Sequence, residues 1–257
     1  LKFSNLITKR EDKMLELYHF WSSTCSRKVR ITLAEKGIEW ESCHVDIVTK
    51  LENLEPDYVK LNPNGVVPTL VHDGNVIIES NIIIEYLDDT FPKISLKPVD
   101  TYQRALMRLW LDTAESQVHK NVNMISYNKR HVPRMDKLFS KDEQRKILMR
   151  SPNPDKRASM LRRLENGVSR EEEIFANQRL GEVMDKIEKK LGESDWLAGD
   201  SFSLADIAIA PFIERFETNG METLVDWNKR PKAGEWWERI QLRNSYQTAY
   251  AFQNPNS

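Results

Sequence analysis

Apolar and polar positions alternate from Leu15 to Phe20, which predicts a half-buried strand. Asp73-Gly74, between two later apolar runs, is typical of a two-residue hairpin turn. The predicted strands cover 15–20, 38–45, 66–71 and 76–78, and the predicted helices cover 25–36, 57–60 and 79–87. The order β-α-β-(α)-β-β-α ends in a hairpin, so we expect a small mixed sheet rather than a doubly wound one.

The strand patterns stop after Pro92. Helical spacing then follows over 102–130 and 171–191, after Asp200, and from near Ala233. The fold class is therefore an α/β domain followed by an all-helical one. We expect domains over 14–91 and 99–252, joined by a Pro-bounded linker.

Composition excludes several classes of protein. The net charge is −1, from 38 Lys and Arg against 39 Asp and Glu, which excludes a globally basic nucleic-acid binder. Two cysteines, Cys25 and Cys43, are too few for a disulfide scaffold or a cysteine-based zinc site, and we expect no metal. The longest apolar run has about seven residues, far fewer than the roughly twenty that a membrane span needs. We expect a soluble, cytoplasmic protein with no membrane or nucleic-acid partner.

Residues 1–13 mix charged side chains and lack the apolar core of a signal peptide. The strand pattern follows directly after Met14. We take Met14 as the natural start and the preceding residues as an extension.

Val67-Pro68 lies within the third apolar strand pattern. Proline donates no hydrogen bond to a β-ladder, so it belongs at a strand start or edge, and the peptide bond before it can be cis. An edge strand that needs protection is one interpretation. The other is that the N–H and C=O of Val67 stay free to pair with an extended, peptide-like cofactor.

Glu79-Ser80 follows a strand and starts a helix. Ser80 can be a simple N-cap. A helix N-terminus also attracts carboxylates, so Ser80 could hold an α-carboxylate while Glu79 takes the neighbouring ammonium. The γ-glutamyl residue of glutathione offers both groups.

The segment 22–28 spans the first strand–helix junction and contains Ser23 and Cys25. A thiol at a helix N-terminus beside Arg27 and Lys28 can have a depressed pKa. Ser23 can equally be only an N-cap, and Cys25 only a small buried residue. The spacing alone does not choose between these interpretations.

Together these features resemble the cytosolic glutathione transferase family, over Met14 to about Phe252. The resemblance implies a thioredoxin-like domain before the helical one, with glutathione as cofactor. It also implies that Ser23 activates the glutathione thiol, a cis-Pro68 opens the third strand, and Glu79 and Ser80 bind the γ-glutamyl group. Ser203-Leu204-Ala205-Asp206 looks like the family's capping box in the helical domain.

Within the family, Ser23-Thr24-Cys25-Ser26 and Val132-Pro133-Arg134 resemble the bacterial tetrachlorohydroquinone reductive dehalogenases. That resemblance implies that Cys25 is catalytic as well. Cys25 to Ile31 also resembles the zeta-like maleylacetoacetate isomerases, and the Ser23-x-x-x-Arg27 spacing is seen in theta-like members. Glu79 before Ser80 and the long 137–170 stretch depart from these patterns.

Several further candidates are weaker. The resemblance would place Lys50 against the glycine carboxylate of glutathione, although a surface lysine is the commoner explanation. Asn123 and Tyr127, one turn apart, could face the electrophile or only pack between helices. We take His119 and His131 as solvated surface residues. The basic 137–170 stretch, with ten Lys and Arg against four Asp and Glu, has no assigned function.

The sequence therefore predicts a glutathione-dependent transferase, homodimeric as this family usually is. Its substrate would be a small hydrophobic electrophile, with reductive dehalogenation or ether cleavage of aromatics as candidate reactions. The alternatives are a maleylacetoacetate isomerase-like enzyme, a non-catalytic interaction module and a thiol–disulfide oxidoreductase acting on proteins. Cys25 has no CxxC partner, which disfavours the last of these.

Overall fold

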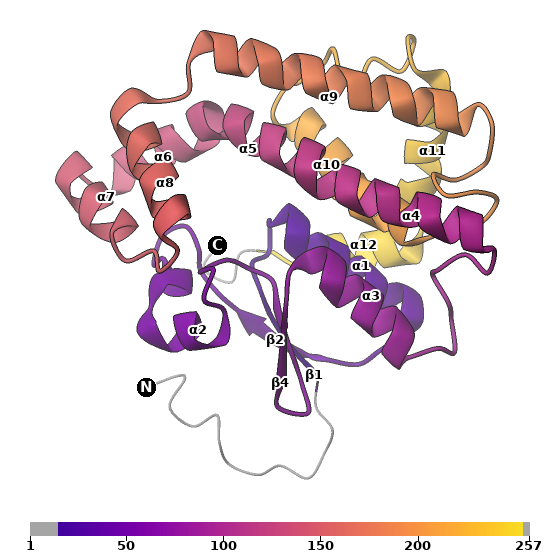
Figure 1. The fold of residues 1–257 in the computed structure, drawn as a ribbon, viewed down its shortest axis with the longest axis horizontal. Helices are drawn as coiled ribbons and strands as arrows, with labels where there is room; N and C mark the ends of the chain where they lie inside the picture. The colour runs from indigo at the N-terminus through magenta and orange to yellow at the C-terminus, as the bar shows by residue number, and fades with distance from the viewer. Residues whose placement is uncertain (1–14, 254–257) are drawn as a thin grey trace.

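The computed structural model describes residues 15–253, so the expected start at Met14 and the extension before it lie outside the described residues. Its N-terminal part is built on a four-stranded sheet with the order β2-β1-β3-β4 (Figure 1). β1 pairs in parallel with β2, whereas β3 is antiparallel to both β1 and β4. The strands are β1 (Leu15–His19), β2 (Glu41–His44), β3 (Thr69–His72) and β4 (Asn75–Ile78). The predicted small mixed sheet is confirmed.

The helices of this part are α1 (Thr24–Lys36), the 3-10 turn η1 (Glu52–Leu54), α2 (Pro56–Leu61) and α3 (Ser80–Thr90). α1 and α3 pack together between the sheet and the helical domain, and α2 lies apart from them (Figure 1). This arrangement is the thioredoxin-like domain that the family resemblance implies.

Two predicted strands are shorter in the structure, each for a local reason. The pattern at 38–45 becomes a strand only from Glu41, because the N–H of Ile38 donates to Leu33 O and completes the C-cap of α1 at Gly37. The pattern at 66–71 becomes a strand only from Thr69, since Pro68 has no N–H. β3 is an inner strand of the sheet, so protection of an edge does not explain this proline.

The remaining described residues form the helical domain. One long helical rod runs from 101 to 138 and includes two π-helical segments, η2 and η3. The predicted helix over 102–130 is therefore correct in type but ends too early. The rod consists of α4 (Thr101–Thr113), η2 (Ala114–His119), α5 (Lys120–Ser126), η3 (Tyr127–His131) and α6 (Val132–Leu138). The helices after it are α7 (Lys141–Leu148), α8 (Pro154–Asn166), α9 (Arg170–Leu191), α10 (Leu204–Thr218), α11 (Pro231–Gln241) and α12 (Asn244–Tyr250).

The basic stretch 137–170 forms α7 and α8, which cross to the α2 side of the sheet domain (Figure 1). Lys156 Nζ in α8 donates to Asn64 O at 3.0 Å, and Arg150 reaches Glu55 at 3.4 Å. The side chain of Pro152 lies against Gly65. This stretch therefore joins the two domains rather than standing apart as a charged surface.

The predicted capping box at the start of α10 is present. Ser203 accepts a hydrogen bond from the helix backbone, while Asp206 Oδ2 accepts from Ser203 N at 2.9 Å. Asp206 Oδ1 also accepts from Leu197 N at 3.0 Å and from Trp236 Nε1 at 2.9 Å. This fully buried carboxylate thus fixes three segments of the helical domain around one point.

The two domains are also joined through α1. Arg30 Nε donates to Ala249 O at 2.9 Å, Arg243 pairs with Glu35 at 2.7 Å, and Arg27 pairs with Glu214. No helix within residues 15–253 is both long enough and apolar enough to cross a membrane. The boundaries 14–91 and 99–252 remain a prediction.

Candidate active site

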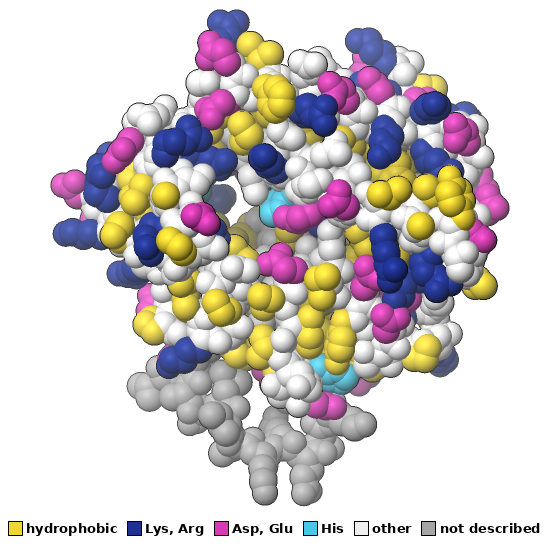
Figure 2. All heavy atoms as spheres, viewed as in Figure 1, with side chains coloured by type: hydrophobic (Ala, Val, Ile, Leu, Met, Phe, Trp, Pro, Cys, Tyr) yellow, Lys and Arg dark blue, Asp and Glu magenta, His cyan; other side chains and the backbone are white. Residues whose placement is uncertain are grey.

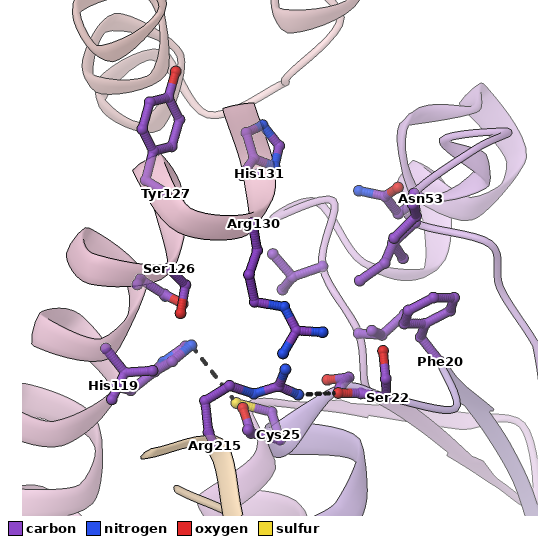
Figure 3. A pocket seen from close by; sticks show the side chains of 18 of the residues that line it. Phe20, Ser22, Cys25, Asn53, His119, Ser126, Tyr127, Arg130, His131 and Arg215 are labelled. Carbon is purple, nitrogen blue, oxygen red and sulfur yellow. Dashed lines mark hydrogen bonds between the residues drawn. The ribbon is translucent and has the colours of Figure 1, made fainter. Parts of the chain in front are cut away.

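A cavity of about 550 Å³ lies between the two domains. The sheet domain contributes the start of α1, the loop before β3 and the start of α3; the helical domain contributes the rod from η2 to α6, together with α8 and α10. In the view of Figure 2 the surface is hollowed between the sheet domain and α8, with Lys and Arg side chains beside the hollow and one histidine at its edge. Figure 3 shows this cavity from close by.

Ser23 is the N-cap of α1 and lines the cavity. Its Oγ accepts a hydrogen bond from Ser26 N at 3.2 Å. A hydroxyl that accepts one bond still has its O–H to donate. Capping and donation to a ligand in the cavity are therefore compatible, and the two interpretations of Ser23 do not compete.

Cys25 lies in the first turn of α1 and faces the rod of the helical domain. Its Sγ is 3.8 Å from His119 Nε2, the contact drawn as a dashed line in Figure 3. The other ring nitrogen, Nδ1 of His119, is 2.9 Å from Glu115 Oε1. The π-helical segment η2 carries both Glu115 and His119. A carboxylate that holds one ring nitrogen orients the other toward its partner, as in catalytic cysteine–histidine pairs.

The surroundings of Cys25 favour its thiolate. Burial raises the pKa of the thiol, but attraction to the cationic side chains of His119 and Lys28 outweighs burial and lowers it to about 7. Attraction to that thiolate in turn raises the pKa of His119 to about 10, against the effect of burial. A thiolate–imidazolium pair is thus the stable form slightly above neutral pH.

This pair predicts the alkylation behaviour of Cys25. The rate of modification by iodoacetamide should rise with pH through a midpoint near 7, below the value of about 8.5 for an ordinary thiol. His119→Gln should move the midpoint above that ordinary value, because burial then acts on the thiol without an opposing imidazolium. Mass spectrometry of the alkylated peptide gives the rate for each cysteine.

Two internal comparisons accompany this measurement. Burial and the carboxylates of Glu16 and Glu41 raise the pKa of Cys43 to about 11, so Cys43 should stay unmodified near neutral pH. His131→Gln replaces an exposed histidine at the same cavity and should leave the midpoint unchanged. If His119→Gln leaves the midpoint of the alkylation profile unchanged, the imidazole ring does not lower the pKa of the Cys25 thiol.

Val67 and Pro68 line the cavity opposite the start of the rod, and the peptide bond between them is cis, as the resemblance implies. The backbone of Val67 forms no backbone hydrogen bond within residues 15–253. The neighbouring Val66 O is used by Tyr58 Oη at 2.6 Å and by Asn62 Nδ2 at 2.9 Å. The Val67 peptide groups thus remain available to an extended ligand.

Glu79 and Ser80 form another wall of the cavity. Glu79 has φ 68° and ψ 114°, a left-handed backbone conformation that is rare for a residue with a side chain and that marks functional sites. Its Oε1 accepts from Asn64 Nδ2 at 3.0 Å. Ser80 is the first residue of α3, is almost fully buried and lines the cavity at the helix start, where the first N–H groups have no partner within the helix.

The structure brings most of the predicted site residues to this one cavity. Lys50 does not line it and is exposed; Ile47, Val48 and Asn53 line that part of the wall instead. The predicted residues that line the cavity are Ser23, Cys25, Val67, Pro68, Glu79, Ser80, Asn123 and Tyr127.

The sequence interpretation of His119 is wrong. Its ring is half-buried against Cys25 and Phe212 rather than solvated, because the rod packs over the start of α1. His131 is exposed, as expected, and stacks on Tyr127 at the cavity. Arg27 does not act on Cys25 as expected: it pairs with Glu214 and lies over the Tyr250 ring.

The sequence interpretation also missed several arginines that line the cavity from the helical domain, among them Arg130 and Arg215. The i, i+4 spacings of Glu115 with His119 and of Arg130 with Arg134 were the available signals for shared helix faces. Within the described residues, no cluster of three or more His, Cys, Asp or Glu side chains is arranged to hold a metal ion.

Comparisons with known proteins agree on both domains. The chain matches the family model "Glutathione S-transferase, N-terminal domain" over residues 22–90 and "Glutathione S-transferase, C-terminal domain" over 156–239. It is 33% identical to Protein LigF of Sphingobium sp. (strain NBRC 103272 / SYK-6) over 89% of this chain and 90% of that protein.

It is also 30% identical to the tetrachloro-p-hydroquinone reductive dehalogenase of Sphingobium chlorophenolicum, over 93% of this chain and 97% of that protein. The crystal structure of the beta-etherase LigF from Sphingobium sp. strain SYK-6 superposes with a TM-score of 0.85 at 31% identity, over 93% of this chain and 99% of that chain. Similarity thus extends over nearly the whole length of both relatives.

Proposed function

This chain belongs to the glutathione S-transferase family and uses glutathione, and from that premise we propose which reaction it carries out and with which residues. We propose that it cleaves an ether bond or removes a halogen from an aromatic electrophile. The observation that carries the proposal is the convergence on one cavity of Ser23, the Cys25–His119 pair and a free peptide group at Val67. The activities named for two relatives, a beta-etherase and a reductive dehalogenase, support it.

In this proposal glutathione lies extended along Val67. Its γ-glutamyl carboxylate binds Ser80 and the N-terminus of α3, and its ammonium binds Glu79. This orientation brings the sulfur to Ser23, whose O–H donates to the thiolate. Lys50 is exposed, so an interaction with the glycine carboxylate would have to form at the outer end of the peptide.

The first step is nucleophilic attack by the glutathione thiolate on the carbon that carries the leaving group. A C–S bond forms, the C–O or C–halogen bond breaks, and phenolate or halide leaves with the electron pair. Ether cleavage requires only this step, for which Ser23 and a well-positioned electrophile suffice.

Reductive removal needs a second sulfur. The Cys25 thiolate attacks the glutathionyl sulfur of the conjugate; an S–S bond forms, the C–S bond breaks, and the carbon takes a proton. A second glutathione then attacks the mixed disulfide, which releases Cys25 and glutathione disulfide. Because Cys25 is held as a thiolate beside His119, its environment favours this route over an isomerase that needs glutathione alone.

Homodimer formation and a cytoplasmic location also belong to the proposal. Large apolar side chains are exposed on α3 and α4, at Ile82, Tyr102 and Leu109. These two helices come from different domains, so a partner that covers both would bury apolar surface from each. Light scattering of the purified protein tests the subunit count.

Ser80→Ala should weaken glutathione binding by about tenfold, since a charged carboxylate loses a hydrogen bond. Titration calorimetry with glutathione measures the dissociation constant. Ser116→Ala, an exposed serine of η2 outside the cavity, is the matched control and should bind like the wild-type protein. Unchanged affinity in Ser80→Ala would place the γ-glutamyl group elsewhere.

The reaction is tested by incubating the purified protein with glutathione and, separately, aryl ethers, chlorinated hydroquinones and maleyl compounds. Mass spectrometry then identifies the products. Ether cleavage or loss of halide supports the proposal, and isomerisation alone would replace it with the isomerase alternative. A protein that neither binds glutathione resin nor turns over any electrophile would instead be an interaction module.

A further inference from the structure

Four arginines line the cavity from the helical side without a carboxylate partner. None of the ion pairs formed within residues 15–253 includes any of the four. They come from separate parts of the domain, so the rod, α8 and α10 each direct positive charge into one space. They are Arg130, Arg134, Arg163 and Arg215.

Arg130 and Arg215 line the cavity near Cys25. Figure 3 shows their guanidinium groups directed toward each other beside Cys25 and Ser22. Burial lowers the pKa of Arg215 to about 10, and the positive charge of Arg130 lowers it as well. Two like charges held together in a partly desolvated site cost free energy that an anion between them would recover.

Most of their hydrogen-bonding capacity is unused. Arg215 Nη2 donates to Ser22 O at 2.7 Å, and Arg130 Nη1 reaches Asn219 Oδ1 at 3.5 Å. Each guanidinium offers five N–H donors in a planar fork that fits an oxygen anion. The Nε atom of Arg163 is buried without a hydrogen-bond partner in the described structure.

The nearby carboxylates are already engaged. Glu115 holds His119 at 2.9 Å, Glu79 accepts from Asn64 at 3.0 Å, and Glu214 pairs with Arg27. Glu214 also attracts Arg130 and Arg215, but it is already paired with Arg27, so the arginine side of the cavity keeps an excess of positive charge.

Glutathione in the proposed orientation leaves this side free. Its γ-glutamyl carboxylate is directed to Ser80, and its sulfur to Ser23, both in the sheet domain. The arginines approach from the helical domain, beyond the sulfur and next to Ser126 (Figure 3). A group attached to the sulfur would extend into this region.

We propose that the electrophile carries an anionic oxygen group, such as a carboxylate or sulfonate, and that Arg130 and Arg215 bind it. This inference rests on the proposed glutathione function and adds the substrate class. The apolar body of the substrate would lie against Val122 and Met160, which also line the cavity. The site thus selects an anionic aromatic compound over its neutral counterpart.

Matched product analogues test the inference without knowledge of the natural substrate. The probes are S-(3-carboxybenzyl)- and S-(4-carboxybenzyl)glutathione and their benzoate methyl esters. They share the peptide and the ring and differ only in the charge on the ring substituent. In calorimetry at pH 7.5, at least one carboxylate should bind about tenfold to hundredfold more tightly than its ester. A difference of this size is on the order of the contribution of one charge-assisted hydrogen bond.

Arg130→Gln should reduce that ratio toward one, and Arg215→Gln, at the other arginine of the proposed pair, should do the same. The affinity for the ester is measured in each variant as well, because normal ester binding shows that the variant is folded. Arg108→Gln removes the same charge from an exposed position that pairs with Glu85, and should keep the full ratio.

The outcomes separate the two proposals. Esters that bind as tightly as both carboxylates, alongside normal glutathione binding, would overturn this inference and leave the glutathione function intact. A ratio that persists in Arg130→Gln and in Arg215→Gln would overturn the assignment of the two arginines. A protein that binds neither glutathione nor any conjugate would overturn the proposed function and this inference together.

Discussion

A Cys25→Ser variant is expected to stop reductive turnover at the glutathionyl conjugate, with formation of the reduced product falling on the order of a thousandfold or more. The hydroxyl cannot form the mixed disulfide that removes the glutathionyl group, and no other sulfur replaces it, because Cys43 lies in β2 outside the cavity. The conjugate should accumulate instead. Mass spectrometry of turnover mixtures distinguishes the conjugate from the reduced product.

Cys43→Ser is the matched control for this experiment. It removes the other thiol, whose pKa burial raises to about 11, and should leave the product distribution unchanged. Full reductive turnover by Cys25→Ser, with no accumulating conjugate, would reduce Cys25 to a packing residue. Ser23 would then be the only catalytic candidate at this helix start.

The second large effect concerns stability. Asp206→Ala should lower the free energy of unfolding by about 3–5 kcal/mol, because it leaves the buried N–H groups of Leu197, Ser203 and Trp236 without their shared acceptor. Each unsatisfied donor costs about 1–3 kcal/mol, and the carboxylate is fully buried. Urea denaturation followed by tryptophan fluorescence measures the change.

Asp200→Ala gives a comparison from the same loop. Asp200 is exposed, so its loss should change stability by about 0.5 kcal/mol or less. A similar stability for the two variants would mean that the capping box adds little to the helical domain. Asp206→Asn should fall between Asp206→Ala and the wild-type protein, since the amide oxygen retains part of the acceptor role.

The fold was largely predictable because its signals are local. Alternation at 15–20, the Asp73-Gly74 turn and Gly37 after the first helix each act within a few residues, and all three features are present in the structure. The predicted strand starts at 38 and 66 were wrong because the N–H of Ile38 completes the C-cap of α1, and because Pro68 has no N–H and Val66 O accepts from Tyr58. Neither hydrogen bond leaves a periodic signal in the sequence.

The sheet-domain side of the site was more predictable than the helical side. Ser23, Val67 and Ser80 lie at strand–helix junctions, where chain position itself indicates a ligand site. His119 comes to Cys25 only because the rod packs across the start of α1, a contact between residues 94 positions apart. The arginines were missed for the same reason, since a charged residue on a helix is usually solvated.

The two π-helical segments make the cavity depend on residue count as well as residue identity. A π-helical turn holds one residue more than an α-helical turn, so a deletion that converted η2 to regular α-helix would change the directions in which Glu115 and His119 project. The contact between His119 and Cys25 would then be lost although neither residue had been replaced. Gains and losses of single residues at η2 would therefore change the helical side of the site, while the residues that line the cavity from the sheet domain keep their positions.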